Sequence, residues 1–288
     1  MRPDLFMMML AISVSCVSFG SITATPVLTR DTFEAGDPIS EKELSDAIFS
    51  KAAGFDSDAF IPWDQQHPEL FEGDIVPTGK KNAIISTYRF WPSAKIPYVI
   101  SASYTAAQRK VIAYAMNEYQ TKTCIRFVPR TNDTNYLQIT KTGTGCWSSV
   151  GRNGGVAAYA GPQKLSLDDG CVASDRPGVT MHELMHAIGF WHEHTRPDRD
   201  TYVSVNLDNV KEKYRNNFIK KLAGQANTLG LPYDYGSVMH YPKGAFAVNP
   251  SIAVIKAKTG NPVLGQRSAF SALDLQKLNK LYKCGTTC

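Results

Sequence analysis

Apolar and polar residues alternate along the chain in patterns that predict both strands and helices. The run at residues 96–101 (IPYVIS) is typical of a buried strand, and residues 125–128 and 137–139 are shorter strand candidates. Residues 105–121 carry apolar side chains three or four positions apart, as on one face of a helix. Glycine-rich turns are expected between residues 143 and 161. Helices and strands therefore mix without regular βα alternation, which favours an α+β fold.

The C-terminal pattern predicts one more helix. Ser271 is its expected N-cap, and Asp274 stands at the third helical position, where it gives a start that resembles a capping box. Leu275, Leu278 and Leu281 then share the inner face of this helix.

Residues 1–24 predict an export signal. Arg2 gives the segment a positive start, an apolar run of 15 residues follows at positions 5–19, and small residues offer cleavage after Gly20 or Ala24. The run is short for a membrane span, and no stop-transfer segment follows it. We therefore expect a secreted, extracellular protein without a stable membrane anchor, rather than a chain that begins with a buried helix.

The net charge of +5 hides two parts of opposite sign. Residues 25–81 hold 5 Lys and Arg against 12 Asp and Glu, a net charge of −7, whereas residues 82–288 hold 25 against 13, a net charge of +12. The acidic part is expected to order only against the basic part, because it can bury little by itself. It ends at Lys80-Lys81, a dibasic pair of the kind that trypsin-like enzymes cut. We interpret residues 25–81 as a propeptide; the alternative is a flexible N-terminal tail.

The cysteines of an exported chain are expected to meet oxidising conditions. Cys16 leaves with the signal, and an odd number remains: Cys124, Cys146, Cys171, Cys284 and Cys288. Two disulfides and one spare thiol are the simplest account, and the sequence alone does not fix the pairing. Cys146 with Cys171 would close a loop of about 26 residues, and Cys124 with Cys284 would tie an early helix to the last one. Cys288 is the natural remainder, either free in a monomer or linked to another chain.

Four of the six histidines lie within 13 residues, in the stretch TMHELMHAIGFWHEH. His182 and His186 are four positions apart, so on a helix both rings project from one face, at the spacing of two ligands of one Zn²⁺. Glu183 lies beside the first ligand and can take a proton from a metal-bound water. Gly189 permits a left-handed turn that brings His192 back as the third ligand. Three neutral imidazoles leave one position of a tetrahedral zinc open, as in catalytic zinc sites.

The extended motif HExxHxxGxxH fixes five positions over eleven residues and is more specific than HExxH alone. It favours a catalytic centre with one Zn²⁺ per chain over a histidine-rich surface helix or a structural metal site. His194 is not an expected ligand and should lie behind the ligands or at the surface. No GxSxG motif occurs, which excludes the nucleophile-elbow hydrolases. The basic residues are scattered rather than grouped with aromatic residues, so no nucleic-acid partner is expected.

Residues 182–200 (HELMHAIGFWHEHTRPDRD) resemble the signature of the astacin family of zinc metalloendopeptidases, within the metzincins. Residues 237–241 (SVMHY) resemble the Met-turn of that family, in which Met239 would lie beneath the metal. The resemblance implies that Tyr241 is a fifth zinc ligand that swings away and stabilises the transition state. It also implies a two-lobed, zincin-like domain at residues 82–288, with a twisted mixed sheet, an active-site helix above the cleft, and a mainly irregular C-terminal lobe that carries a terminal helix.

The resemblance also covers segments outside these two motifs. Residues 71–74 (FEGD) match the FxGD element of the family, which implies that Asp74 binds the zinc in place of water and keeps a zymogen inactive. Residues 122–130 (KTCIRFVPR) and 145–151 (GCWSSVG) match further family segments. The disulfides that the resemblance implies are Cys124–Cys284 and Cys146–Cys171.

An activating cleavage is implied by the same resemblance. Mature members begin at a sequence like Asn82-Ala83-Ile84, so cleavage after Lys81 is expected. The new α-amino group would be buried and would reach Glu193 through water, because a buried charge needs a partner of opposite charge.

Together these features predict a secreted zinc metalloendopeptidase that is made as a zymogen and hydrolyses internal bonds of protein or peptide substrates. Glu183 would be the general base, and zinc with Tyr241 would stabilise the oxyanion. An extended substrate is expected to pair with an edge strand near residues 147–150. The alternative is a catalytically silent zinc-binding protein, such as a toxin or a binding module, on the same scaffold. Asn132 begins the one N-glycosylation sequon and is a candidate for modification.

Overall fold

The computed structural model describes residues 33–47, 70–76, 87–155 and 160–285. Four features of the sequence analysis lie outside these residues: the signal, the dibasic pair Lys80-Lys81, the expected new terminus at Asn82, and Cys288.

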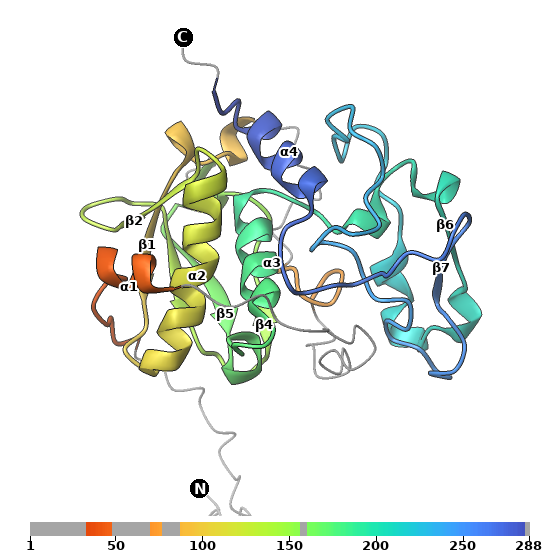
Figure 1. Cartoon of the computed structure of the whole chain (residues 1–288), viewed down its shortest axis with the longest axis horizontal. Helices are drawn as coiled ribbons and strands as arrows, with labels where there is room; N and C mark the ends of the chain where they lie inside the picture. Colours follow the sequence, from red (N-terminus) through yellow and green to blue (C-terminus); the bar gives the residue numbers. More distant parts are fainter. Residues whose placement is uncertain (1–32, 48–69, 77–86, 156–159, 286–288) are drawn as a thin grey trace, which may run out of the picture. The chain divides into compact units, whose positions relative to one another are not determined.

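A five-stranded mixed sheet forms the N-terminal lobe, with the strand order β2-β1-β3-β5-β4 (Figure 1). Its strands are β1 (Lys95–Ile100), β2 (Arg126–Pro129), β3 (Tyr136–Thr140), β4 (Cys146–Trp147) and β5 (Pro162–Leu167). Neighbouring strands run parallel except β4, which pairs antiparallel with β5 at the edge of the sheet. The mixed sheet with its helices confirms the predicted α+β fold.

Two long helices, α2 and α3, pack against each other and against the sheet (Figure 1). The α-helices of the described chain are α1 (Glu41–Asp46), α2 (Ala106–Lys122), α3 (Pro177–Ile188) and α4 (Ala272–Leu281). Helix α2 begins with a capping box between Thr105 and Gln108, and α4 begins with the box between Ser271 and Asp274 that the sequence predicts. No helix in the described ranges has the length and apolar character needed to cross a membrane.

The apolar pattern does not predict strand β5, because two polar side chains are buried within it. Gln163 donates from its side chain to the carbonyl of Gly151 at 2.9 Å, and Ser166 donates to the carbonyl of Gly145 at 2.7 Å. The glycine-rich turns therefore supply acceptors for polar groups of the strand, which removes the cost of burying those groups.

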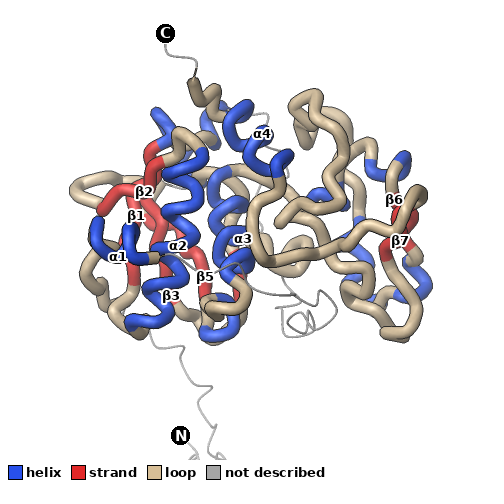
Figure 2. Tube along the Cα trace, viewed as in Figure 1, coloured by secondary structure: helices blue, strands red, loops and turns tan. Residues whose placement is uncertain are grey.

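The C-terminal lobe is mainly irregular, as the resemblance implies (Figure 2). It contains the short antiparallel pair β6 (Val203–Val205) and β7 (Ile255–Ala257), together with loops and 3₁₀ turns. A second apolar cluster, separate from the core of the N-terminal lobe, holds it together and includes Tyr241. Met239 belongs to the first cluster, so the segment between these two residues passes from one core to the other.

Two disulfides tie elements of the domain together. Cys124, just after α2, bonds to Cys284, just after α4, and Cys146 in β4 bonds to Cys171 before α3. These are the two pairs that the resemblance implies.

Replacing Gly178 with alanine is expected to destabilise the domain. Gly178 lies in the first turn of α3, and a Cβ atom there would lie 2.3 Å from the backbone carbonyl of Arg267. Helix and loop would have to separate, at a cost of about 2 kcal/mol or more, or roughly 4–8 °C in Tm. Thermal unfolding measures the effect. Gly170→Ala is the matched control, because its Cβ would meet nothing within 4 Å; equal Tm values for both variants would contradict the prediction.

Candidate metal centre

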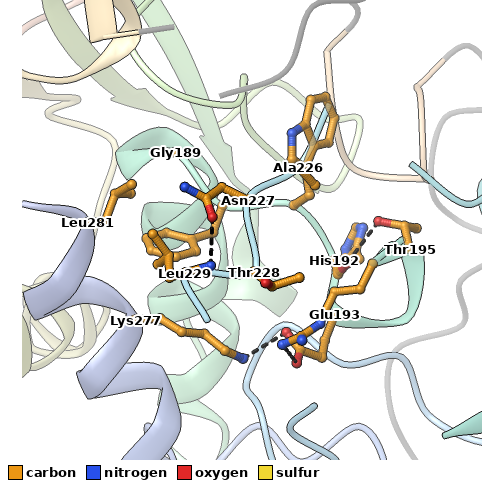
Figure 3. A pocket seen from close by; sticks show the side chains of 13 residues that line it. Gly189, His192, Glu193, Thr195, Ala226, Asn227, Thr228, Leu229, Lys277 and Leu281 are labelled. Atoms are coloured by element: carbon orange, nitrogen blue, oxygen red, sulfur yellow. Dashed lines mark hydrogen bonds and ion pairs between the residues drawn. The ribbon is translucent and has the colours of Figure 1, made fainter. Parts of the chain in front are cut away.

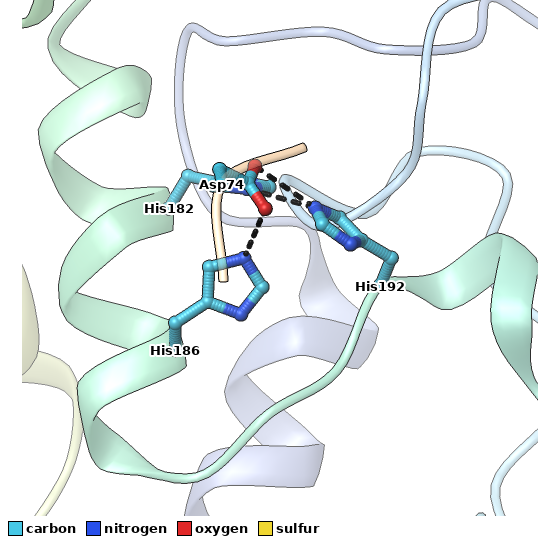
Figure 4. Close-up of side chains that lie close together, drawn as sticks. All are labelled: Asp74, His182, His186 and His192. Carbon is cyan, nitrogen blue, oxygen red and sulfur yellow. Dashed lines mark hydrogen bonds and ion pairs between the residues drawn. The ribbon is translucent and has the colours of Figure 1, made fainter. Parts of the chain in front are cut away.

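Helix α3 positions the first two histidines of the motif. Pro177 stands at its start, and every residue of the helix is buried. Gly189 ends the helix with a φ of 135°, a value that favours glycine, and its N–H donates to the carbonyls of Met185 and His186 at 3.1 and 2.8 Å. The chain then turns back and brings His192 opposite the helix (Figure 4).

The imidazoles of His182, His186 and His192 converge with the carboxylate of Asp74 (Figure 4). The Nε2 atoms of His182 and His192 are 3.2 Å apart, and Asp74 Oδ2 lies 3.2 and 3.1 Å from them. The Nε2 atom of His186 lies 3.5 Å from Asp74 Oδ1. All four side chains are buried. The structure thus brings together the three predicted ligands and the predicted switch residue.

The other ring nitrogen of each histidine contacts an oxygen atom. The Nδ1 atoms of His182 and His186 are 2.8 and 2.7 Å from backbone carbonyl oxygens. The Nδ1 atom of His192 is 2.8 Å from the carboxylate of Glu72. Because these oxygens accept hydrogen bonds, each Nδ1 carries a proton, so in the neutral ring the lone pair of Nε2 faces the shared centre.

These four donors fit one divalent metal ion. Zinc lies about 2.0–2.1 Å from its nitrogen ligands, so the donors of a tetrahedral site are about 3.3 Å apart. The separations of 3.1–3.5 Å match this value. His186 Nε2 and Asp74 Oδ1 are also buried without a hydrogen-bond partner in the described part of the chain, as expected of atoms that bind a metal.

Burial and neighbouring charge set the protonation of the cluster. Burial lowers the pKa of His182 and of His186, which favours the neutral ring that binds a metal. Burial also disfavours charge on His192, but the carboxylates of Asp74 and Glu72 outweigh it and raise the pKa of His192. Burial likewise opposes ionisation of Asp74, but the surrounding histidines hold the pKa of Asp74 well below its ordinary value.

Glu183 lies next to the ligands without belonging to the converging group. Its side chain is buried, and its Oε2 atom has no hydrogen-bond partner among the described residues. Burial first, and then the charge of Asp74, raises the pKa of Glu183 well above its ordinary value. Glu183 therefore holds a proton more readily than an exposed glutamate does.

Comparison with known proteins identifies the family to which this arrangement belongs. The sequence model of Astacin, a peptidase family, matches residues 83–283, more than half of the chain, including all three histidines. The chain belongs to the astacin family. The chain spans less than two thirds of the length of several curated relatives that it matches.

The relatives include zinc proteases similar to most of the chain. Zinc metalloproteinase nas-4 of Caenorhabditis elegans is 38% identical over 296 positions, covering 94% of this chain and 89% of that protein. Zinc metalloproteinase nas-13 of the same organism is 37% identical over 300 positions, covering 95% of this chain and 64% of that protein. High choriolytic enzyme 1, a hatching enzyme zinc-protease from Oryzias latipes (medaka fish), has a solved structure that matches with a TM-score of 0.62 at 39% identity, covering 69% of this chain and 96% of that chain.

In this astacin-family chain, residues 70–76 occupy the site. Phe71 and Ile75 exchange backbone hydrogen bonds of 2.8 and 2.9 Å, and the turn between them presents Asp74 to the histidines. Beyond β4, the N–H of Ser148 donates to the carbonyl of Asp74, and the carbonyl of Ser148 accepts from the segment, both at 2.9 Å. The edge that is expected to bind an extended substrate therefore binds a segment of the chain itself.

Glu72 and Lys221 are site residues that the sequence analysis missed. The buried carboxylate of Glu72 contacts His192 and forms an ion pair with the ammonium of Lys221. That ammonium also lies 4.0 Å from the ring centre of Phe71 and 3.7 Å from that of Trp191. The FEGD motif contains Glu72 and so offered a signal for it, whereas no local pattern points to Lys221.

Tyr241 lies beside the ligands, behind the same segment. Its ring centre is 4.6 Å from that of His192 and 3.9 Å from that of His194, on which it stacks. Its hydroxyl donates to the backbone carbonyl of Glu72.

His194 is fully buried and lies behind the three converging histidines, which is one of its two expected positions. The backbone carbonyl of Met239 accepts a hydrogen bond from the backbone N–H of Glu193, at 3.0 Å.

Glu193 borders a cavity of about 60 Å³, which has room for several water molecules (Figure 3). Its carboxylate accepts hydrogen bonds from Lys277 at 2.7 Å, from Arg196 at 3.1 Å and from the backbone N–H of Asp234 at 2.9 Å. Two cations therefore already neutralise Glu193 in this structure.

Asp274 connects the last helix to His182, a candidate metal ligand, which is a role beyond the capping that the sequence predicts. Its buried carboxylate accepts from the hydroxyl of Ser237 at 2.6 Å and from the N–H of Val238 at 2.8 Å. The carbonyl of Val238 in turn accepts from Nδ1 of His182 at 2.8 Å. Burial raises the pKa of Asp274 to about 6. Helix α4 thus helps to orient a ring that is 92 positions earlier in the chain.

Proposed function

We propose that this chain is a zinc metalloendopeptidase that is made as a zymogen and hydrolyses internal bonds of protein substrates. The observation that carries the proposal is the convergence of His182, His186 and His192 with Asp74 at distances that suit one metal ion. Bound zinc would supply Lewis acidity for the peptide carbonyl and for the attacking water. The three imidazoles would hold it, with Nδ1 contacts that keep each ring in the required tautomer.

Glu183 is the proposed general base. It follows a ligand directly on a fully buried helix, and its Oε2 atom has no other hydrogen-bond partner in the described part of the chain. It would accept a proton from the attacking water and return that proton to the leaving amine.

Tyr241 is the proposed donor to the oxyanion. Its hydroxyl donates to a backbone carbonyl of residues 70–76, which supports a role in donating to the carbonyl of a substrate. The stacking of its ring on His194 limits the positions that this hydroxyl can reach.

Latency is the proposed role of residues 70–76. Asp74 takes up the fourth donor position, and the segment occupies the sheet edge beyond β4.

Processing of the chain completes the proposal: residues 1–24 guide export, and cleavage follows Lys81. Asn132, between β2 and β3, is exposed and accessible for glycosylation. The new amino group would be a third cation near Glu193, beside Lys277 and Arg196.

The proposal is tested with purified protein cut after Lys81. We expect hydrolysis of an unfolded protein substrate, loss of hydrolysis after treatment with 1,10-phenanthroline, recovery on adding Zn²⁺, and one zinc per chain by elemental analysis. A stoichiometric zinc content without hydrolysis would favour the silent binding protein. The absence of bound metal would overturn both readings.

Replacing Tyr241 with phenylalanine is expected to lower kcat by about 10²-fold and to change KM little, because a donor to the transition state is removed. Steady-state kinetics of the cut enzyme measure both constants. Tyr235→Phe is the matched control, since its hydroxyl donates to the carbonyl of Tyr202 away from the histidines. An unchanged kcat would remove Tyr241 from the mechanism.

A further inference from the structure

Residues 33–47 bind the N-terminal lobe at a place different from the metal centre. Ala35 pairs antiparallel with Ser101, just after β1. The N–H of Gly36 donates to the carbonyl of Ile100 at 2.8 Å, and the carbonyl of Glu34 accepts from Ala102 at 3.0 Å. Helix α1 of this segment packs against α2 (Figure 1).

Arg109 of α2 is the polar centre of this contact. Its guanidinium binds both carboxylate oxygens of Glu43, at 2.7 and 3.0 Å, and the carbonyls of Asp37 and Pro38 at 2.9 and 3.1 Å. The arginine side chain is 16% exposed, so much of this contact is shielded from water. The hydrogen bond from Arg109 lowers the pKa of Glu43 to about 2, so the pair stays charged at neutral pH.

The apolar side of the segment belongs to the core of the lobe. Ile39 and Ala47 are 5% and 1% exposed and lie in the same cluster as residues of β1, α2 and α3. Leu44 packs against that cluster, and the backbone N–H of Ile39 donates to the buried hydroxyl of Tyr98 at 2.9 Å. Removal of the segment would therefore expose apolar surface of the lobe that the segment now covers.

Cleavage after Lys81 breaks none of these contacts. The fragment that ends at Lys81 carries both the cleft segment, residues 70–76, and the segment at residues 33–47. Two contacts on one covalent fragment support each other. When one segment is released, the other stays bound and keeps the released segment close to its binding site.

We propose that residues 33–47 and the surface around Arg109 form a lasting interface, so that the cut protein is a complex of two chains. This inference rests on one part of the proposed function, the cleavage of the chain after Lys81. Full release of the fragment from this complex requires both contacts to break, so it is a separate, slower step than the cut.

The test uses the full chain with a specific protease site in place of Lys80-Lys81. After the cut, we expect the fragment to co-elute with the remainder in native size-exclusion chromatography, with both masses found after denaturation. Arg109→Met should speed release of the fragment by about tenfold or more, because it removes a bidentate contact to a carboxylate. Arg130→Met is the matched control, since the guanidinium of Arg130 donates to the carbonyl of Asp133 and lies over the ring of Tyr136, and its fragment should be released as in the wild type.

A second variant guards against a folding defect caused by the change in α2. Glu43→Gln lies on the fragment, leaves residues 82–288 unaltered, and keeps a side chain that can complete the capping box of α1. It should also speed release. Immediate separation of the wild-type fragment, or equal release rates for all variants, would overturn the interface. Failure of the proposed function would look different: no fraction would hydrolyse substrate, whether or not the fragment co-elutes.

Discussion

Glu183→Gln is expected to leave the metal site intact and to lower kcat/KM of the cut enzyme by about 10²- to 10⁴-fold, the contribution of a general base. Glutamine has the shape of glutamate but cannot accept the proton of the attacking water. The three imidazoles should still bind the metal, because their Nδ1 partners are other groups: two backbone carbonyls and, before the cut, Glu72.

Two measurements check this result: zinc content by elemental analysis and turnover of a quenched fluorescent peptide. Glu118→Gln is the matched control, because Glu118 is also buried but pairs with Lys122 on α2. The control should stay within about twofold of wild-type turnover, as expected for a site outside the mechanism. Near-normal turnover of Glu183→Gln would exclude Glu183 as the base.

Asp74→Ala is expected to raise hydrolysis by the uncut chain by about 10- to 100-fold. The change removes the carboxylate that lies 3.1–3.5 Å from the three histidines, and a net contribution of about 1.5–3 kcal/mol, as for a charge-assisted contact, corresponds to this range. The remaining contacts of Glu72 with Lys221 and Tyr241 should keep the chain below the activity of the cut enzyme.

The experiment is done with Lys80 and Lys81 replaced by glutamine, so that cleavage there does not contribute. Initial rates on a peptide substrate are compared with those of the same chain carrying Asp74. Asp37→Ala is the control, since Asp37 is exposed and contacts Arg109 through its backbone carbonyl. A precursor that stays silent after Asp74→Ala would contradict the aspartate switch.

Local patterns predicted the elements whose formation depends on nearby residues. The helical stripe of α2, the capping box of α4, and the spacing of His182 and His186 all lie within one or a few turns of helix, where sequence distance and spatial distance agree. Strand β5 was not predictable in this way, because its buried Gln163 and Ser166 depend on acceptors in turns that precede it.

The sequence alone indicated the kind of chemistry: three imidazoles and an adjacent glutamate lie in a motif that implies zinc, and the family resemblance adds a tyrosine. Only the tertiary structure decided how that centre is supported and covered. The pairing of Glu72 with Lys221, the contact of Asp274 with the backbone that orients His182, and the docking of residues 33–47 on Arg109 all join residues distant in sequence. Side-chain spacing along one helix is fixed by local geometry, whereas partners across the fold are chosen by burial, since a charge removed from water must find its counterpart wherever the packed chain places it.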